Sequence, residues 1–75
     1  MQGYKDIGGD SGVVAYKIGP DSIIVRFKEG TVYLYTYASA GSRMIETMKK
    51  LAAKGKGLST YISRYVKNRY ALKLQ

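Results

Sequence analysis

Positive charge is the feature of this 75-residue sequence that bears most directly on its chemistry. The formal net charge is +8, and from residue 43 onward nine lysines and arginines accompany one acidic residue, Glu46, whereas charges balance in residues 1–42. A one-sided excess of this kind favours a polyanionic partner, most naturally nucleic acid. The alternative is a solvated face that keeps a small domain soluble. The candidate phosphate contacts are Lys49, Lys50, Lys54, Lys56, Arg64 and Lys67, with Arg26 as a weaker candidate.

The stretch KGKGLST, residues 54–60, adds a candidate loop for a phosphate group. Gly55 and Gly57 would let backbone amides turn inward just before a helix begins, and the Ser59 hydroxyl would add a donor. The alternative is a glycine that ends one helix and is followed by a linker, and for the loop taken alone this alternative is favoured. Nucleotide hydrolysis is not expected, because the spacing differs from G-x-x-x-x-G-K-[ST].

Three tyrosines alternate in TVYLYTY, residues 31–37, where rings can either stack on bases or fill a core. Exposed beside Arg26, they would form a stacking platform for unpaired bases. A three-residue loop with a left-handed Gly30 suits the sequence before this strand, and the register that it sets turns the rings inward. The position of Tyr37, near the strand end, stays open. The residues predicted to share the inward face are Ile23, Val25, Phe27, Tyr33 and Tyr35.

Catalytic chemistry has little support in the composition. The chain has no histidine, no cysteine and five scattered acids, so it lacks the usual groups for proton transfer, metal binding and activated nucleophiles. We therefore expect no enzyme activity, metal, cofactor or small-molecule substrate. The absence of cysteine suggests a cytoplasmic protein. The sequence has neither a signal pattern nor an apolar run of about 20 residues, so no membrane association is expected.

The elements that must position these residues follow from hydrophobic periodicity. Residues 1–10 contain three glycines without a period and predict a flexible N-terminal arm, and residues 11–75 predict a single domain. The fold class expected is α+β: a three-stranded antiparallel β-meander followed by two amphipathic helices packed on one sheet face. The strands are expected at 12–18, 22–28 and 31–37, and the helices at 43–54 and from about residue 59.

Each helix has its own apolar stripe. We expect Ser42 to cap the first helix, and residues 68–75 either to extend the second helix or to leave it as an extended end. The predicted buried residues are Ile45, Met48, Leu51 and Ala52 in the first helix and Leu58, Tyr61, Ile62, Tyr65 and Val66 in the second.

The other sheet face raises a second functional hypothesis. The register that turns the tyrosines inward leaves Ile24, Val32 and Leu34 outward beside Arg26. Monomers seldom expose such a cluster, so either a helix or a second copy of the chain is expected to cover it. A homodimerising protein-interaction module without a nucleic-acid role is therefore the alternative function.

The order of these parts also carries a family resemblance. The pieces are Tyr16, the alternating Ile23, Val25 and Phe27, then Gly30, Tyr33 and Tyr35, AAKGK at 52–56, Ile62, and RYALKL at 69–74. Over about residues 11–74 they resemble the KTSC domain, a short module named for its place at the C-terminus of some lysyl-tRNA synthetases and also found as small stand-alone bacterial proteins. That family is uncharacterised, and RNA binding is the role suggested for it. We therefore expect a non-catalytic module that binds RNA or single-stranded DNA with low base specificity.

Overall fold

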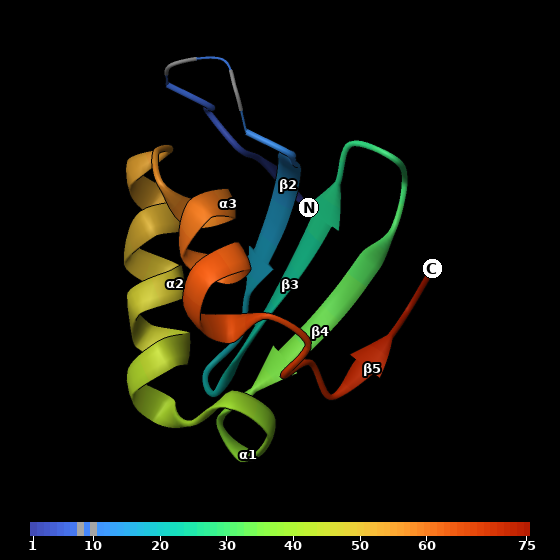
Figure 1. Ribbon diagram of the computed structural model, residues 1–75, viewed down its shortest axis with the longest axis vertical. Helices are drawn as coiled ribbons and strands as arrows, with labels where there is room; N and C mark the ends of the chain where they lie inside the picture. The colour runs from blue at the N-terminus through green and yellow to red at the C-terminus, as the bar shows by residue number, and fades with distance from the viewer. Residues whose placement is uncertain (8, 10) are drawn as a thin grey trace.

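The protein is built from an antiparallel sheet with helices packed on one face (Figure 1). The computed structural model describes residues 1–7, 9 and 11–75. The α+β class and the antiparallel sheet are confirmed, but the expected count of three strands is wrong, because a two-residue strand lies at each edge. The strands, in their spatial order, are β1 (Gln2–Gly3), β2 (Val13–Ile18), β3 (Ser22–Phe27), β4 (Val32–Thr36) and β5 (Leu72–Lys73).

The hairpin between β3 and β4 has the register that the sequence predicts. The N–H of Phe27 donates to the carbonyl of Thr31 at 2.8 Å, and Gly30 in the loop between them has a φ of 95°. Val25 consequently lies opposite Tyr33. Because side chains alternate along a strand, this pairing turns the tyrosines toward the face that the helices cover.

The helices begin earlier than the sequence predicts. Tyr37 starts a short helix instead of ending a strand, because Thr36 and Ser39 form a reciprocal cap: the Thr36 side chain accepts the Ser39 N–H at 3.1 Å, and the Ser39 side chain accepts the Thr36 N–H at 3.0 Å. Ser42 lies inside the next helix, which Gly41 caps, so the expected cap is wrong. The helices are α1 (Tyr37–Ala40), α2 (Ser42–Lys54), α3 (Leu58–Tyr61) and the π-helix η1 (Ile62–Val66).

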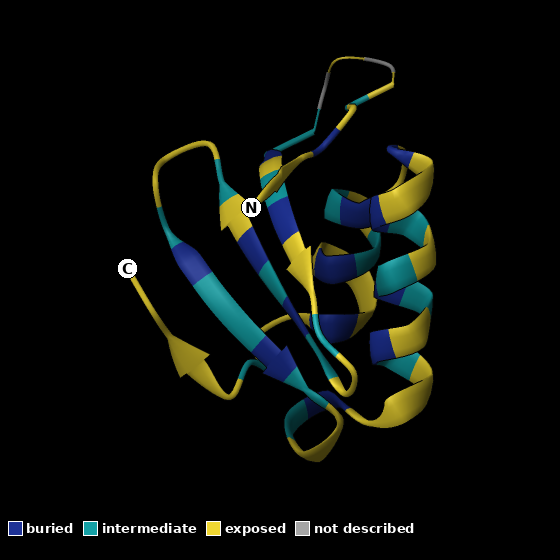
Figure 2. Ribbon diagram, turned by 180° about the vertical axis from the view of Figure 1, so that it is seen from behind, coloured by how far each residue is buried: buried dark blue, intermediate teal, exposed yellow. Residues whose placement is uncertain are grey.

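The core lies between the sheet and the helical layer (Figure 2). Of the inward sheet residues, Tyr35 is buried, whereas Phe27 and Tyr33 are only partly buried. Each large apolar side chain that is fully buried stabilises the fold by about 1.5 to 3 kcal/mol. The core residues are Tyr4, Val13, Tyr16, Ile23, Val25 and Tyr35 from the N-terminal segment and the sheet, and Ala40, Ile45, Met48, Ala52, Leu58, Ile62 and Val66 from the helices. Val32, which the register turns toward the other sheet face, is also buried, at 4% exposed.

The second predicted helix changes its winding halfway along. In η1 the hydrogen bonds are those of a π-helix, in which each N–H bonds to the fifth carbonyl back. Leu58, Ile62 and Val66, spaced by four residues across α3 and η1, are buried, whereas Tyr65 in η1 is exposed. Tyr65 is 57% exposed, so its prediction as a core residue is wrong, and Tyr61 is half-buried.

The N-terminal residues that the structure describes are more ordered than the arm expected over residues 1–10. β1 pairs antiparallel with β2 at the edge of the sheet. Tyr4 then enters the core, where it is 8% exposed and its ring meets that of Tyr16 edge-on at 6.5 Å. These contacts attach the start of the chain to the rest of the fold. Gly8 and Asp10 lie outside the described residues.

The C-terminal residues leave the helix and rejoin the sheet. After Val66 the chain turns at Lys67, whose φ is 52°, and then β5 pairs with β4 so that Leu72 lies opposite Leu34. The extended end, one of the two courses that the sequence left open, is therefore the one adopted. Leu72 and Leu74 are 57% and 46% exposed beside the sheet face on which no described helix packs (Figures 1 and 2).

Candidate nucleic-acid interface

Five of the predicted phosphate contacts are exposed on the helical layer. Lys50 and Lys54 lie on α2, Lys56 lies in the loop after it, Arg64 lies on η1, and Lys67 follows η1 directly (Figure 1). The apolar stripe of each helix faces the sheet, so these charged residues project from the same layer into solvent. We call these five residues the helical cations.

Arg26 is separated from the helical cations. It lies in β3, opposite Ala15 of β2 and Val32 of β4, and its side chain is exposed. Its position alternates with those of the core residues Val25 and Phe27, so it points away from the helices. A phosphate bound at Arg26 would therefore occupy a different face of the molecule.

Lys49 is half-buried, and groups of the protein occupy its ammonium. The Nζ atom donates to the carbonyl of Pro20 at 2.9 Å and pairs with Glu46 Oε2 at 2.9 Å. It also lies 5.6 Å from the centre of the Tyr37 ring. An ammonium has three N–H donors, so these contacts leave little capacity for a phosphate, and Lys49 is not one of the helical cations.

Glu46, the single acid of the second half, is neutralised locally. The Tyr37 hydroxyl donates to Glu46 Oε2 at 2.6 Å, and Lys49 pairs with the same oxygen. The hydrogen bond from Tyr37 lowers the pKa of the Glu46 carboxyl, and the bond from Lys49 lowers it further by a smaller amount. The hydrogen bond between Tyr37 and Glu46 also raises the pKa of Tyr37. Within residues 1–7, 9 and 11–75 this is the one ion pair, so the helical cations there have no acidic partner.

The Lys-Gly loop is occupied by the N-terminal segment. Gly55, with a φ of 81°, ends α2 by donating its N–H to the Leu51 carbonyl at 2.9 Å, and its own carbonyl accepts the N–H of Ile7 at 2.7 Å. The N–H of Leu58 donates to the Tyr4 hydroxyl at 3.2 Å. These bonds favour the helix-end interpretation over a phosphate cradle, because amides of the loop already have protein acceptors.

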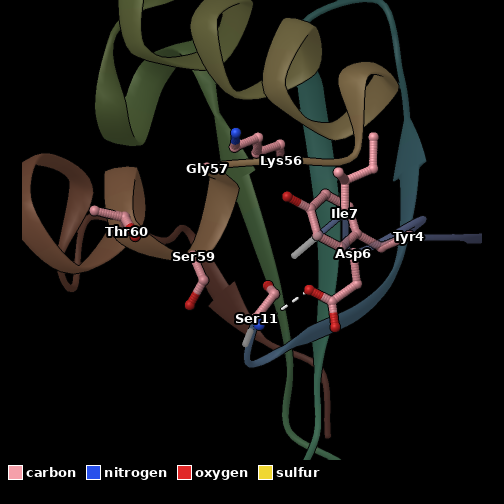
Figure 3. A pocket seen from close by; sticks show the side chains of 8 residues that line it. All are labelled: Tyr4, Asp6, Ile7, Ser11, Lys56, Gly57, Ser59 and Thr60. Carbon is pink, nitrogen blue, oxygen red and sulfur yellow. Dashed lines mark hydrogen bonds between the residues drawn. The ribbon is translucent and has the colours of Figure 1, made fainter. Parts of the chain in front are cut away.

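The other two residues of the proposed phosphate loop, Gly57 and Ser59, line a small pocket of about 270 Å³ beside it (Figure 3). The carboxylate of Asp6 lies in the same pocket, where its Oδ1 atom accepts the N–H of Ser11 at 3.0 Å. A fixed negative charge at this position opposes the binding of phosphate. The lining residues are Tyr4, Asp6, Ile7, Ser11, Lys56, Gly57, Ser59 and Thr60.

Lys5 is a cation at this loop that the sequence analysis does not single out. Its aliphatic stem lies across Gly55, since a Cβ atom added to Gly55 would come within 2.6 Å of the Lys5 Cβ. Gly55 is therefore required both for its positive φ and for this close approach. The packing brings Lys5 next to the loop that holds Lys54 and Lys56, and no local pattern signals a contact between such distant segments.

A second pocket, also of about 270 Å³, opens where the helical layer ends. The rings of Tyr33 and Tyr70 stack with centres 4.3 Å apart and planes inclined by 31°, and Phe27 meets Tyr33 edge-on at 5.9 Å. The pKa of Tyr35 is raised to about 12, mainly because the hydroxyl is buried and to a smaller extent because Tyr33 and Tyr70 lie nearby. We call this the tyrosine pocket, and its lining residues are Phe27, Glu29, Tyr33, Tyr35, Ile62, Lys67, Asn68 and Tyr70.

One further ring is available on the helical layer itself. Tyr65 packs against Tyr61 with ring centres 5.2 Å apart, and more than half of the Tyr65 side chain is exposed. It follows Arg64 in η1, so an exposed ring and an exposed cation are neighbours. The sequence gives no sign of this pair, because the helical period predicts Tyr65 in the core.

Comparison of the chain with protein-family models, with curated proteins and with solved structures finds no match. The fold and the charges define a small basic α+β domain, and the resemblance to the KTSC domain stays a prediction. In the part of the chain that the structure describes, no three side chains of histidine, cysteine, aspartate or glutamate gather as metal ligands. No described helix combines the length and the apolar character that spanning a bilayer requires.

Proposed function

We propose that this protein binds RNA or another single-stranded nucleic acid, without catalysing a reaction, through the outer surface of its helical layer. The observation that carries the proposal is the set of exposed helical cations on one layer, free of acidic partners among the described residues. Such a set attracts phosphates without reading sequence. The resemblance to the KTSC domain, for which RNA binding is suggested, agrees with this function.

The aromatic residue beside these cations favours single strands over duplexes. Unpaired bases expose their ring faces, whereas paired bases are stacked inside the helix. Tyr65 offers an exposed ring next to Arg64, and Lys50, Lys54 and Lys56 extend the positive surface. Phosphate contacts would therefore supply most of the affinity, and stacking would supply the preference for unpaired bases.

The experiment is a fluorescence anisotropy titration of labelled single-stranded RNA, repeated at several salt concentrations. With about four phosphate contacts, the slope of log K against log salt is expected to be about −3 for a single strand. The matching duplex should bind more weakly. An absence of binding to either RNA at low salt would contradict the proposal.

Two double variants locate the binding surface. Lys54→Glu with Lys56→Glu changes the helical layer, and Lys17→Glu with Arg26→Glu makes the same change in net charge on the other sheet face. The first is expected to weaken binding to all sequences and to reduce the salt slope, whereas the second should have a small effect. Equal weakening by both would mean that overall charge, and not the helical layer, attracts the RNA.

Self-association through the uncovered sheet face is the second candidate function. Ile24, Leu34 and Leu72 form a row across β3, β4 and β5, and Leu72 is more than half exposed. Sedimentation velocity at two protein concentrations tests this candidate. A dimer that Leu72→Lys dissociates would support it, and a strict monomer at both concentrations would exclude it.

A further inference from the structure

The tyrosine pocket exists because the helical layer stops short of the end of the sheet. η1 ends at Val66, and Lys67 turns the chain with φ 52° and ψ −122°, which is an unusual conformation for a residue with a side chain. The chain then returns as β5 along the edge of β4. The rings between η1 and the β3–β4 hairpin are therefore enclosed on several sides, yet they still border an open cavity.

The walls of the pocket are held in place by one another. Tyr70 stacks on Tyr33, meets Tyr35 edge-on with ring centres 6.3 Å apart, and so links the C-terminal segment to two positions of β4. Phe27 supports Tyr33 from the other strand of the hairpin. Tyr35 is 1% exposed and cannot move without disturbing the core. A ligand would thus meet rings that are already ordered, which reduces the entropic cost of binding.

The mouth of the pocket carries polar groups of three kinds. Asn68 offers an amide that both donates and accepts hydrogen bonds, Glu29 offers a carboxylate that only accepts, and Lys67 offers an ammonium that only donates. All three are exposed. Planar rings with an amide and a carboxylate at the rim suit a flat heterocycle that has donors and acceptors on its edge, and the ammonium suits an adjoining phosphate.

We propose that the tyrosine pocket binds one base of the nucleic acid, and this inference rests on the proposed function of the helical layer. The base packs against the rings of Phe27, Tyr33 and Tyr70, its edge meets Asn68 and Glu29, and Lys67 contacts its phosphate. Lys67 belongs to both the helical cations and the pocket, so one strand reaches both sites. The Glu29 carboxylate only accepts, and the one edge donor of uracil, N3–H, lies between two carbonyl oxygens that a carboxylate repels, so bases with an exocyclic amino group bind better than uracil.

A direct test uses adenosine 5′-monophosphate, with ribose 5-phosphate as its matched control without a base. The probes are titrated into isotope-labelled protein, and amide shifts are followed by NMR. Adenosine 5′-monophosphate should shift the amides of Asn68, Tyr70 and Glu29, and ribose 5-phosphate should leave Glu29 and Tyr70 unshifted. Equal shifts from both compounds, or none at the pocket, would overturn the base site.

Oligonucleotide binding separates a failure of the pocket from a failure of the helical interface. The strands are an adenine-rich RNA, a uracil-rich RNA and an abasic strand of equal length, which keeps the phosphates and lacks the bases. Tyr70→Leu should weaken binding of the adenine-rich strand by about 5- to 100-fold and leave binding of the abasic strand unchanged. Tyr37→Leu, the same substitution outside the pocket, should leave both unchanged.

The remaining outcomes are also decisive. If Tyr70→Leu binds the adenine-rich strand as tightly as the unmodified protein does, the base site is overturned. If the abasic strand still binds in that case, the helical interface stands. Glu29→Gln, at an exposed position, provides a second variant if Tyr70→Leu does not fold, and it should reduce the preference for the adenine-rich over the uracil-rich strand, because an amide both donates and accepts. A preference that is intact in Glu29→Gln would contradict the assigned edge contact.

Discussion

The two ends of the helix pair formed by α3 and η1 use their polar and aromatic groups in opposite ways. At the N-terminal end, the Leu58 N–H bonds to the Tyr4 hydroxyl and the Gly55 carbonyl bonds to Ile7, so the protein satisfies its own groups there. At the C-terminal end, the rings around Tyr70 border a cavity whose rim is polar. At the end that resembles a ligand loop in the sequence, backbone groups are thus bonded within the protein and an acidic side chain lies in the neighbouring pocket, whereas the end that resembles a core has aromatic rings that border an open pocket.

A glycine-rich, lysine-rich loop is therefore not by itself a phosphate site. Loop amides bind a ligand only if nothing in the protein reaches them first. Tyr4 and the residues after it reach the loop, whereas no equivalent segment among the described residues fills the tyrosine pocket. The lysines of the loop, in contrast, stay exposed and keep their positive charge for a partner.

The largest difference between the two ends is expected from removing one ring at each. Tyr4→Ala should destabilise the fold by about 3 to 5 kcal/mol, because it empties a buried site in the core. Tyr70→Ala should cost about 1 to 2 kcal/mol, because that ring is only partly buried. Chemical denaturation followed by circular dichroism measures both. Equal losses of stability would show that Tyr70 is as much a part of the core as Tyr4.

Two glycine variants test the seating of the N-terminal segment at the loop. Gly55→Ala should cost about 2 to 4 kcal/mol, since it adds a clash with Lys5 to the cost of a positive φ. Gly57→Ala, with a φ of 84° and a nearest contact of 3.7 Å, should cost only the backbone term of about 1 to 2 kcal/mol. If thermal unfolding finds the two equally destabilised, Lys5 does not pack on Gly55 in solution.

Removing single hydroxyl groups gives a smaller and more specific contrast. Tyr4→Phe should cost about 1 to 3 kcal/mol, because it leaves the buried Leu58 N–H without an acceptor. Tyr70→Phe should leave stability almost unchanged, because the ring contacts remain. Hydrogen exchange should also speed up at Leu58 in the first variant alone. An unchanged exchange rate there would mean that water replaces the hydroxyl and that this end is less closed than the structure indicates.

The pH dependence that Tyr35 produces tests the tyrosine pocket alone. Its pKa of about 12 in the fold lies above the ordinary value of 10.0, so the unfolded chain loses this proton first as pH rises. The contribution of Tyr35 to stability is complete below pH 10 and declines between pH 10 and about 12. Urea midpoints across that range, compared with those of Tyr35→Phe, isolate the effect. If the difference in phenol absorbance between the two proteins shows that Tyr35 titrates near pH 10, the Tyr35 hydroxyl is not shielded from water in the tyrosine pocket.

Much of the central sheet was predictable, because its signals are local. The alternation in β3 and the glycine in the hairpin set a register that the structure confirms, and this register fixes which residues face the helices. The edge strands were not predictable, since β1 and β5 have two residues each and form only against an existing sheet. The π-helix was missed for a related reason: a period of 3.6 residues assumes regular α-helical winding, and Tyr65 lies inside the π-helix.

Within the candidate site, the sequence identified the cations but not their availability. Lys50 and Lys54 are exposed as expected, whereas Lys49 is held by Pro20 and Glu46. The contact with Pro20 joins residues that are distant in the sequence, so no periodic pattern predicts it. The tyrosine pocket escaped prediction similarly, because Tyr70 reaches Tyr33 only after the chain has left the helix.

The α+β class, the hairpin register and the concentration of positive charge in the second half follow from the amino-acid sequence, because each depends on neighbouring residues or on composition. Three features come from the packing of the folded chain: which of those charges lack an acidic partner among the described residues, the bonds from the N-terminal segment to the Lys-Gly loop, and the four aromatic rings that border a cavity. The physical reason is that these features are contacts between segments far apart in the chain, and they form only when packing brings the segments together.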